Sequence, residues 1–140
     1  MRKKLRNRAE GGAARLRDAG LRPTRQRLEL AALLFAQGHR HLTAEELFGD
    51  ATRAGAKVSL ATVYNTLNQF TRAGLLRQVV VDAQSSYFDT NTDAHQHFFV
   101  EDDARLIDIP ADAVSVSGVP APPKGTVLQH VDVVVRVRRT

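Results

Sequence analysis

The stretch Ser59-Leu60-Ala61-Thr62-Val63-Tyr64-Asn65-Thr66-Leu67 predicts a helix with two different faces. Ser59 is a favoured N-cap residue. Apolar residues recur at helical spacing and form one buried stripe: Leu60, Val63, Leu67 and Phe70. The opposite face carries hydroxyls, amides and an arginine: Thr62, Tyr64, Asn65, Asn68, Gln69 and Arg72. Amides pair with adenine and arginine pairs with guanine, so this face suits the reading of base edges in DNA. A solvated polar face is the plainer alternative, but such faces usually carry Lys and Glu, which are absent here.

Three further helices are expected before this one. Residues 13–19 could form a short helix that ends at Gly20. Thr24 then caps a helix that runs to Phe35. The next start has the strongest signature, because Thr43 and Glu46 have the spacing of a capping box and Leu42 and Leu47 that of a hydrophobic staple.

Strands are expected after the helices. Residues 77–81 and 86–88 alternate around a turn, which predicts a hairpin. The helices and this hairpin follow the order of a winged helix-turn-helix, which we place at residues 13–88. Residues 97–100 and 105–109 are further expected strands, and a last one carries alternating valines on its buried face: Val131, Val133, Val135 and Val137. Because three strands cannot bury a core alone, we expect residues 95–140 to dimerise through this last strand.

Composition limits the classes of protein to consider. The chain has 140 residues, no cysteine and a net charge of +5. Without cysteine, any metal must be held by histidine, carboxylate or amide groups. No apolar run is long enough to cross a bilayer and no export signal is recognisable, so we expect a cytoplasmic protein.

Charge is distributed unevenly along the chain. Residues 1–27 carry ten Lys and Arg against two acids, a net charge of +8, and the rest sums to −3. The segment 89–112 contains seven acids and a single arginine. We expect residues 1–12 to be a basic flexible arm that binds a polyanion, with a merely solvated arm as the alternative.

His95 and His97 lie two residues apart in an expected strand, so their rings point to the same side. Asp89 precedes them and Asp108 follows. Mixed imidazole and carboxylate ligands suit Fe(II), Mn(II) or Zn(II). Two surface histidines without a ligand are the alternative, and His41, in the other half of the chain, taken alone fits an exposed loop residue.

Several motifs resemble the ferric uptake regulator family in order and spacing across residues 15–140. They are residues 21–27 (LRPTRQR), 41–47 (HLTAEEL), 59–67 (SLATVYNTL), 87–89 (YFD), His95-x-His97 and 106–109 (LIDI). The resemblance implies an α+β dimer, in which an N-terminal winged helix is joined by a hinge, here residues 89–94, to a small α/β dimerisation domain. It also implies a regulatory cation site whose ligand positions fall on His41, Asp89, His95, His97 and Asp108.

The chain also resembles particular branches of this family. Two aspartates at the carboxylate positions are similar to the peroxide-sensing branch. Residues 59–68 (SLATVYNTLN), 73–78 (AGLLRQ) and the valine-rich end resemble the iron response regulators, which sense iron through haem. The family's structural zinc cysteines are missing, and their first loop reads Val100-Glu101-Asp102-Asp103. Ala94 and Gln96 replace ligands of a second regulatory site, and Gln96 also interrupts a run of three histidines. Any haem would need a histidine as its axial ligand.

The sequence therefore predicts a homodimeric regulator of iron homeostasis that binds a roughly palindromic DNA operator. Its expected effector is Fe(II) or Mn(II), with Zn(II) competing in vitro and haem as the other candidate. The residues expected to contact DNA are Arg22, Arg25, Ser59, Thr62, Tyr64, Asn65, Asn68 and Arg72. Two rival hypotheses are a metal-independent architectural DNA-binding protein and a small non-haem iron enzyme with a facial triad.

Overall fold

The computed structural model describes residues 12–140, which divide into two compact units after Thr92. The division falls within the hinge expected at residues 89–94. The expected basic arm lies outside the described residues except for Gly12.

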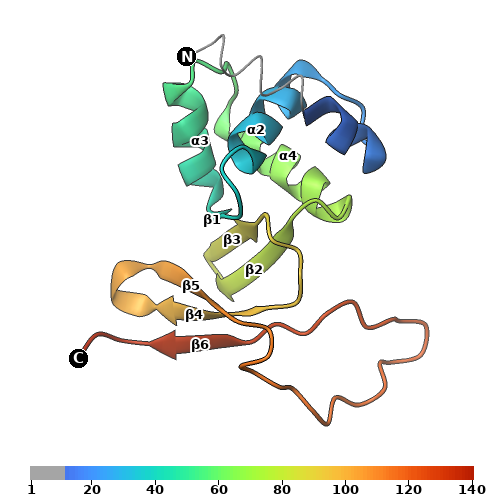
Figure 1. Ribbon diagram of the computed structural model, residues 1–140, viewed down its shortest axis with the longest axis vertical. Coiled ribbons are helices and arrows are strands. Elements are labelled where there is room, and N and C mark those ends of the chain that lie inside the picture. The colour runs from blue at the N-terminus through green and yellow to red at the C-terminus, as the bar shows by residue number, and fades with distance from the viewer. Residues whose placement is uncertain (1–11) are drawn as a thin grey trace. The chain divides into compact units, whose positions relative to one another are not determined.

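The first unit contains the helices that the sequence predicted. Residues 12–18 are helical, followed by α2 (Arg25–Phe35), α3 (Ala44–Arg53) and α4 (Leu60–Arg72). Their N-caps are confirmed, because the side chains of Thr24, Thr43 and Ser59 each accept a hydrogen bond from a backbone N–H three residues later. Figure 1 shows these helices grouped beside a small sheet.

That small sheet is the wing of the winged helix. It contains β1 (His41–Leu42), β2 (Arg77–Asp82) and β3 (Ser85–Asp89) in the order β1-β3-β2, and both pairings are antiparallel. The hairpin between β2 and β3 was predicted, and its turn is closed where the Asp82 carboxylate accepts from the Gln84 N–H at 2.8 Å. Strand β1 was not predicted, because two residues have no measurable periodicity.

The core of the first unit lies between the helices and the wing. The expected stripe of α4 is buried at Val63, Leu67 and Phe70, which are all 0% exposed, whereas Leu60 at the helix start is half-buried. Leu30 and Phe88 join the same apolar cluster from α2 and β3. Burial of this face leaves the polar face of α4 directed to solvent.

The second unit is a sheet of β4 (Gln96–Val100), β5 (Arg105–Ile109) and β6 (Val134–Val137) in the order β5-β4-β6. Strand β5 is antiparallel to β4, and β6 is parallel to it. Within residues 93–140 the helical part is the single 3-10 turn η1 (Glu101–Asp103) between β4 and β5. With the helical first unit, the chain has the predicted α+β class.

The C-terminal segment is tied to this turn. The Arg139 backbone N–H donates to Asp102 at 2.8 Å, and its guanidinium pairs with Asp103. The guanidinium holds the pKa of the Asp103 carboxyl below its ordinary value. This polar contact joins the loop where the resemblance implied zinc cysteines to the segment that follows β6 (Val134–Val137).

The last strand is shorter than the predicted run of valines. It begins at Val134, so Val131 and Val133 precede it. The reason is that the Gln96 side chain, and not the backbone of a neighbouring strand, bonds the Val131 carbonyl and the Val133 N–H. Its amide donates to the Val131 carbonyl at 3.3 Å, and its oxygen accepts from the Val133 N–H at 2.6 Å. The valines are half-buried rather than buried.

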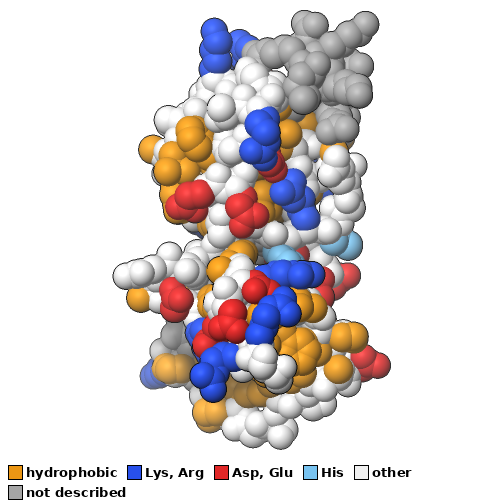
Figure 2. Space-filling view, turned by 90° about the vertical axis from the view of Figure 1, so that its left-hand side faces the viewer, with side chains coloured by type: hydrophobic (Ala, Val, Ile, Leu, Met, Phe, Trp, Pro, Cys, Tyr) orange, Lys and Arg blue, Asp and Glu red, His pale blue; other side chains and the backbone are white. Residues whose placement is uncertain are grey.

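One face of the second sheet remains apolar and open. Phe98 pairs with Ile107 on one side and with Val135 on the other, so the three share a face. Phe98 is 38% exposed and Ile107 40%. Apolar side chains also reach the molecular surface in Figure 2. Among the described residues, no helix combines the length and the apolar character that crossing a membrane requires.

Candidate metal centre and DNA-facing helix

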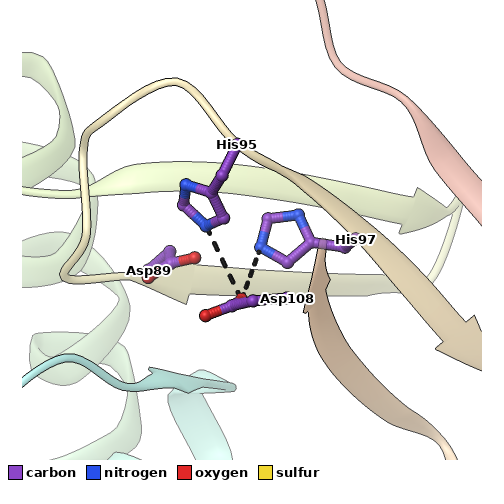
Figure 3. Close-up of side chains that lie close together, drawn as sticks. All are labelled: Asp89, His95, His97 and Asp108. Carbon is purple, nitrogen blue, oxygen red and sulfur yellow. Dashed lines mark ion pairs between the residues drawn. The ribbon is translucent and has the colours of Figure 1, made fainter. Parts of the chain in front are cut away.

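Three side chains of the second unit converge on one point. The Nε2 atoms of His95 and His97 lie 3.6 Å and 3.4 Å from the same oxygen of Asp108. Figure 3 shows both rings directed at this carboxylate. The two imidazole centroids are 4.6 Å apart. Strand pairing brings the groups together, because His97 on β4 is the direct partner of Asp108 on β5. Both histidines are buried, and Asp108 is half-exposed.

The hydrogen bonding of His95 fits a metal ligand. Its Nδ1 lies 2.7 Å from the Asp93 carbonyl, which can only accept, so Nδ1 carries the proton. In a neutral ring Nε2 therefore presents a lone pair toward the Asp108 carboxylate. A backbone carbonyl that fixes the tautomer in this way is typical of metal-bound histidine. Donor atoms around a tetrahedral metal lie roughly 3.4 Å apart, close to the separations seen here.

The other two predicted ligands belong to the first unit. Asp89 is the last residue of β3, and its partner on β1 is His41. Residues paired in this way have Cβ atoms about 5 Å apart, so the two side chains are neighbours. Asp89 is buried and His41 half-buried. The unexpected strand β1 is thus what places His41 beside Asp89.

The residues expected to contact DNA are accessible. Tyr64, Asn65, Asn68 and Arg72 are exposed on α4, and Thr62 is half-buried. Ser59, the N-cap of this helix, is exposed. Arg22 and Arg25, near the start of α2, are exposed as well. Arg25 also forms an ion pair with Glu29 at 3.1 Å, so part of its charge is compensated within its own helix.

Two polar side chains at the margins of this helix are anchored by neighbouring helices. On one side the Tyr64 hydroxyl donates to Glu45 of α3 at 2.6 Å, and this bond raises the pKa of Tyr64. On the other side Gln69 accepts from Arg27 of α2. Neither Glu45 nor Arg27 was among the residues predicted to contact DNA. No local pattern could reveal the second contact, because its partners are 42 residues apart.

Comparisons with known proteins agree with this architecture. The family model described as "Ferric uptake regulator family" matches residues 18–134. The peroxide-responsive repressor PerR of Staphylococcus aureus (strain Mu50 / ATCC 700699) is 34% identical over 99 residues. That stretch is 71% of this chain and 66% of the relative, slightly less than two thirds of its length.

Solved structures are similar over most of the chain. The ferric uptake regulator from Pseudomonas aeruginosa, solved with manganese, is 29% identical with a TM-score of 0.68, covering 90% of this chain and 96% of that one. The Vibrio cholerae ferric uptake regulator is 26% identical with a TM-score of 0.72, covering 91% and 99%. The chain therefore belongs to the ferric uptake regulator family.

Proposed function

We propose that this protein is a homodimeric transcriptional regulator of iron homeostasis whose affinity for a roughly palindromic operator is set by Fe(II) or Mn(II). The observation that carries the proposal is the convergence of His95, His97 and Asp108 at 3.4–3.6 Å in a buried setting. We propose that the chain acts by binding and not as an enzyme.

The ligand set we propose adds Asp89 and His41 to these three residues. Asp89, His95, His97 and Asp108 are the group in the described part of the chain whose side chains could hold a metal ion. His41 is the strand partner of Asp89, which supports its inclusion. Ligands of nitrogen and oxygen suit Fe(II) and Mn(II), and Zn(II) would compete in vitro by the Irving–Williams order. This donor set supports a metal ion over haem as the effector.

Ligands contributed by both units would link metal binding to DNA binding. His41 and Asp89 belong to the unit that carries α4, and the other three belong to the second unit. A bound divalent cation supplies the positive charge that holds these ligands together. The shared ligands would then favour one arrangement of the two units, and the ion must bind that arrangement more tightly to shift the population.

Calorimetry with Mn(II), paired with DNA titrations, tests the sensor. His95→Ala should abolish most metal binding, and His41→Ala should weaken it less but uncouple it from DNA affinity. His130→Ala is a matched control, because His130 also pairs with a carboxylate, Asp132, at 3.2 Å but lies outside the site. Unchanged binding of one equivalent per subunit by His95→Ala would place the metal elsewhere. Unchanged DNA affinity of the wild type with and without a chelator would favour the architectural alternative.

A second experiment tests whether α4 reads bases. Tyr64→Ala and Asn65→Ala should each lose about 1–3 kcal/mol of specific binding and keep their affinity for random DNA. We propose the same face, including Thr62, Asn68 and Arg72, as the operator contact. Equal losses on operator and random duplexes would contradict base reading by these side chains.

A further inference from the structure

An open polar hollow of about 530 Å³ lies between the start of α2 and the face of α4. Its lining includes Arg22, Thr24 and Arg27 from the first side and Thr62, Asn65 and Gln69 from α4. None of the described residues that line it is acidic. The hollow therefore carries the positive charge of two arginines without a carboxylate among its walls.

Arg27 is held in this lining by three hydrogen bonds. Its Nε and Nη2 donate to the Gln69 side-chain oxygen at 3.3 Å and 3.1 Å, and its Nη1 donates to the Arg22 carbonyl at 2.9 Å. These bonds use three of the five N–H groups of a guanidinium. Because a guanidinium only donates, the Gln69 amide must turn its oxygen to Arg27, and its NH₂ group keeps its donors.

The two threonine hydroxyls of the hollow, like Gln69, accept internal hydrogen bonds and keep their donors. The Thr24 oxygen accepts from the Arg27 backbone N–H at 3.3 Å, and the Thr62 oxygen accepts from the Ser59 hydroxyl at 3.0 Å. Each hydroxyl still has its own O–H to donate. Internal bonds thus engage acceptors at Thr24, Thr62 and Gln69, while donors remain for a ligand.

A ligand for such a lining is negatively charged and accepts hydrogen bonds. The non-bridging oxygens of a phosphodiester only accept, whereas the edges of bases present donors as well as acceptors. The start of α2 adds a favourable helix dipole for an anion. We propose that the hollow seats one phosphate of the DNA backbone, with Arg27 as its central cation and Gln69 as a second donor. This inference rests on the proposed docking of α4 on DNA.

Replacing single phosphates of the DNA by uncharged linkages tests this proposed phosphate-binding site. Operators are first selected from random duplexes with the Mn(II)-loaded wild type. Duplexes with one uncharged methylphosphonate linkage at each position are then titrated with the same protein. The wild type should lose roughly tenfold in affinity at one linkage in each half-site, whereas Arg27→Gln should bind that duplex and its unmodified parent equally well.

Salt dependence provides a second measurement. Arg27→Gln should lower the slope of log K against log salt by about one unit per half-site, whereas Arg27→Lys should keep it. Arg53→Gln is the matched control, since it removes the same charge from an arginine already paired with Asp50, and its slope should change little. Gln69→Ala should weaken binding to all sequences to a similar degree. Circular dichroism and the Arg27→Lys variant separate loss of contact from loss of fold.

The outcomes distinguish the phosphate site from the proposed function. If the wild type selects an operator but Arg27→Gln keeps full sensitivity at every linkage, the phosphate seat is wrong and the proposed function stands. A changed base preference in Gln69→Ala would make the hollow a base-reading site and also overturn the inference. If the wild type prefers no sequence over random DNA, the proposed function fails, and the seat fails with it.

Discussion

His97→Ala should remove the stabilisation that Mn(II) gives to the folded protein. The wild type should gain about 2.7 kcal/mol when free Mn(II) is a hundred times its dissociation constant. For a chain of this size that corresponds to a rise in Tm of roughly 10 °C. His97 is 1% exposed and its Nε2 lies 3.4 Å from Asp108, so the substitution removes a buried nitrogen donor from the proposed site. If its removal weakens affinity about a hundredfold, the gain falls to about 0.4 kcal/mol at the same concentration.

The assay is thermal unfolding with and without Mn(II), and the quantity compared is the metal-induced shift. Using this difference cancels the packing cost of the substitution itself. His130→Ala provides the control, because its partner Asp132 also lies within ion-pair distance, whereas the His130 side chain is 51% exposed and that of His97 is 1% exposed. A full shift in His97→Ala would refute the site, and so would an equal loss of the shift in His130→Ala.

Three further predictions concern assembly, capping and pH. Replacing Val133 and Val135 with Asp should give monomers or unfolded chain in light scattering, since these half-buried valines border the open apolar face. Ser59→Ala should cost about 1 kcal/mol in chemical unfolding, because its hydroxyl accepts from the Thr62 N–H at 3.1 Å. Asp103→Asn should lower the denaturation midpoint at neutral pH. The difference should vanish at acid pH, because a carboxyl with a lowered pKa stabilises the fold above its unfolded pKa and stops doing so below its folded pKa.

Each of these has a matched control. Val127→Asp, at a position that is 78% exposed, should leave the oligomeric state unchanged. Ser59→Thr keeps the capping oxygen and should keep most of the stability. Asp112→Asn removes an exposed carboxylate without altering the contact between Asp103 and Arg139. A dimer that survives the double valine change, or a midpoint that is equally low at both pH values for Asp103→Asn, would contradict the corresponding assignment.

The helices were predictable because their signals are local. A cap at Thr24, Thr43 or Ser59 acts on an N–H only three residues away, and the stripe of α4 is visible as spacing. The pair His95 and His97 was predictable for the same reason. The structure confirms the expected pairing of the two strands around an acidic turn, and this pairing sets Asp108 opposite His97.

The contacts that were missed are long-range or too short to show a pattern. Strand β1 has two residues, and only its pairing with β3 reveals it. Arg27 and Gln69 meet because α2 packs against α4, which no spacing within either helix encodes. The start of β6 was misplaced because a side chain, that of Gln96, satisfies backbone groups that alternation alone assigns to a neighbouring strand.

The hydrogen bond from Gln96 should affect how fast the backbone amide of Val133, just before β6, exchanges its hydrogen. A backbone amide in a ladder exchanges its hydrogen when the strand opens, but the Val133 amide is held by a side chain that a single rotamer change can withdraw. Its hydrogen exchange should therefore be faster than that of the amides within β6. Because Gln96 stands between His95 and His97, restraining those two rings should also slow this rotation. The hydrogen-exchange rate of the Val133 amide would then report metal binding at His95 and His97, although Val133 is not itself a proposed ligand.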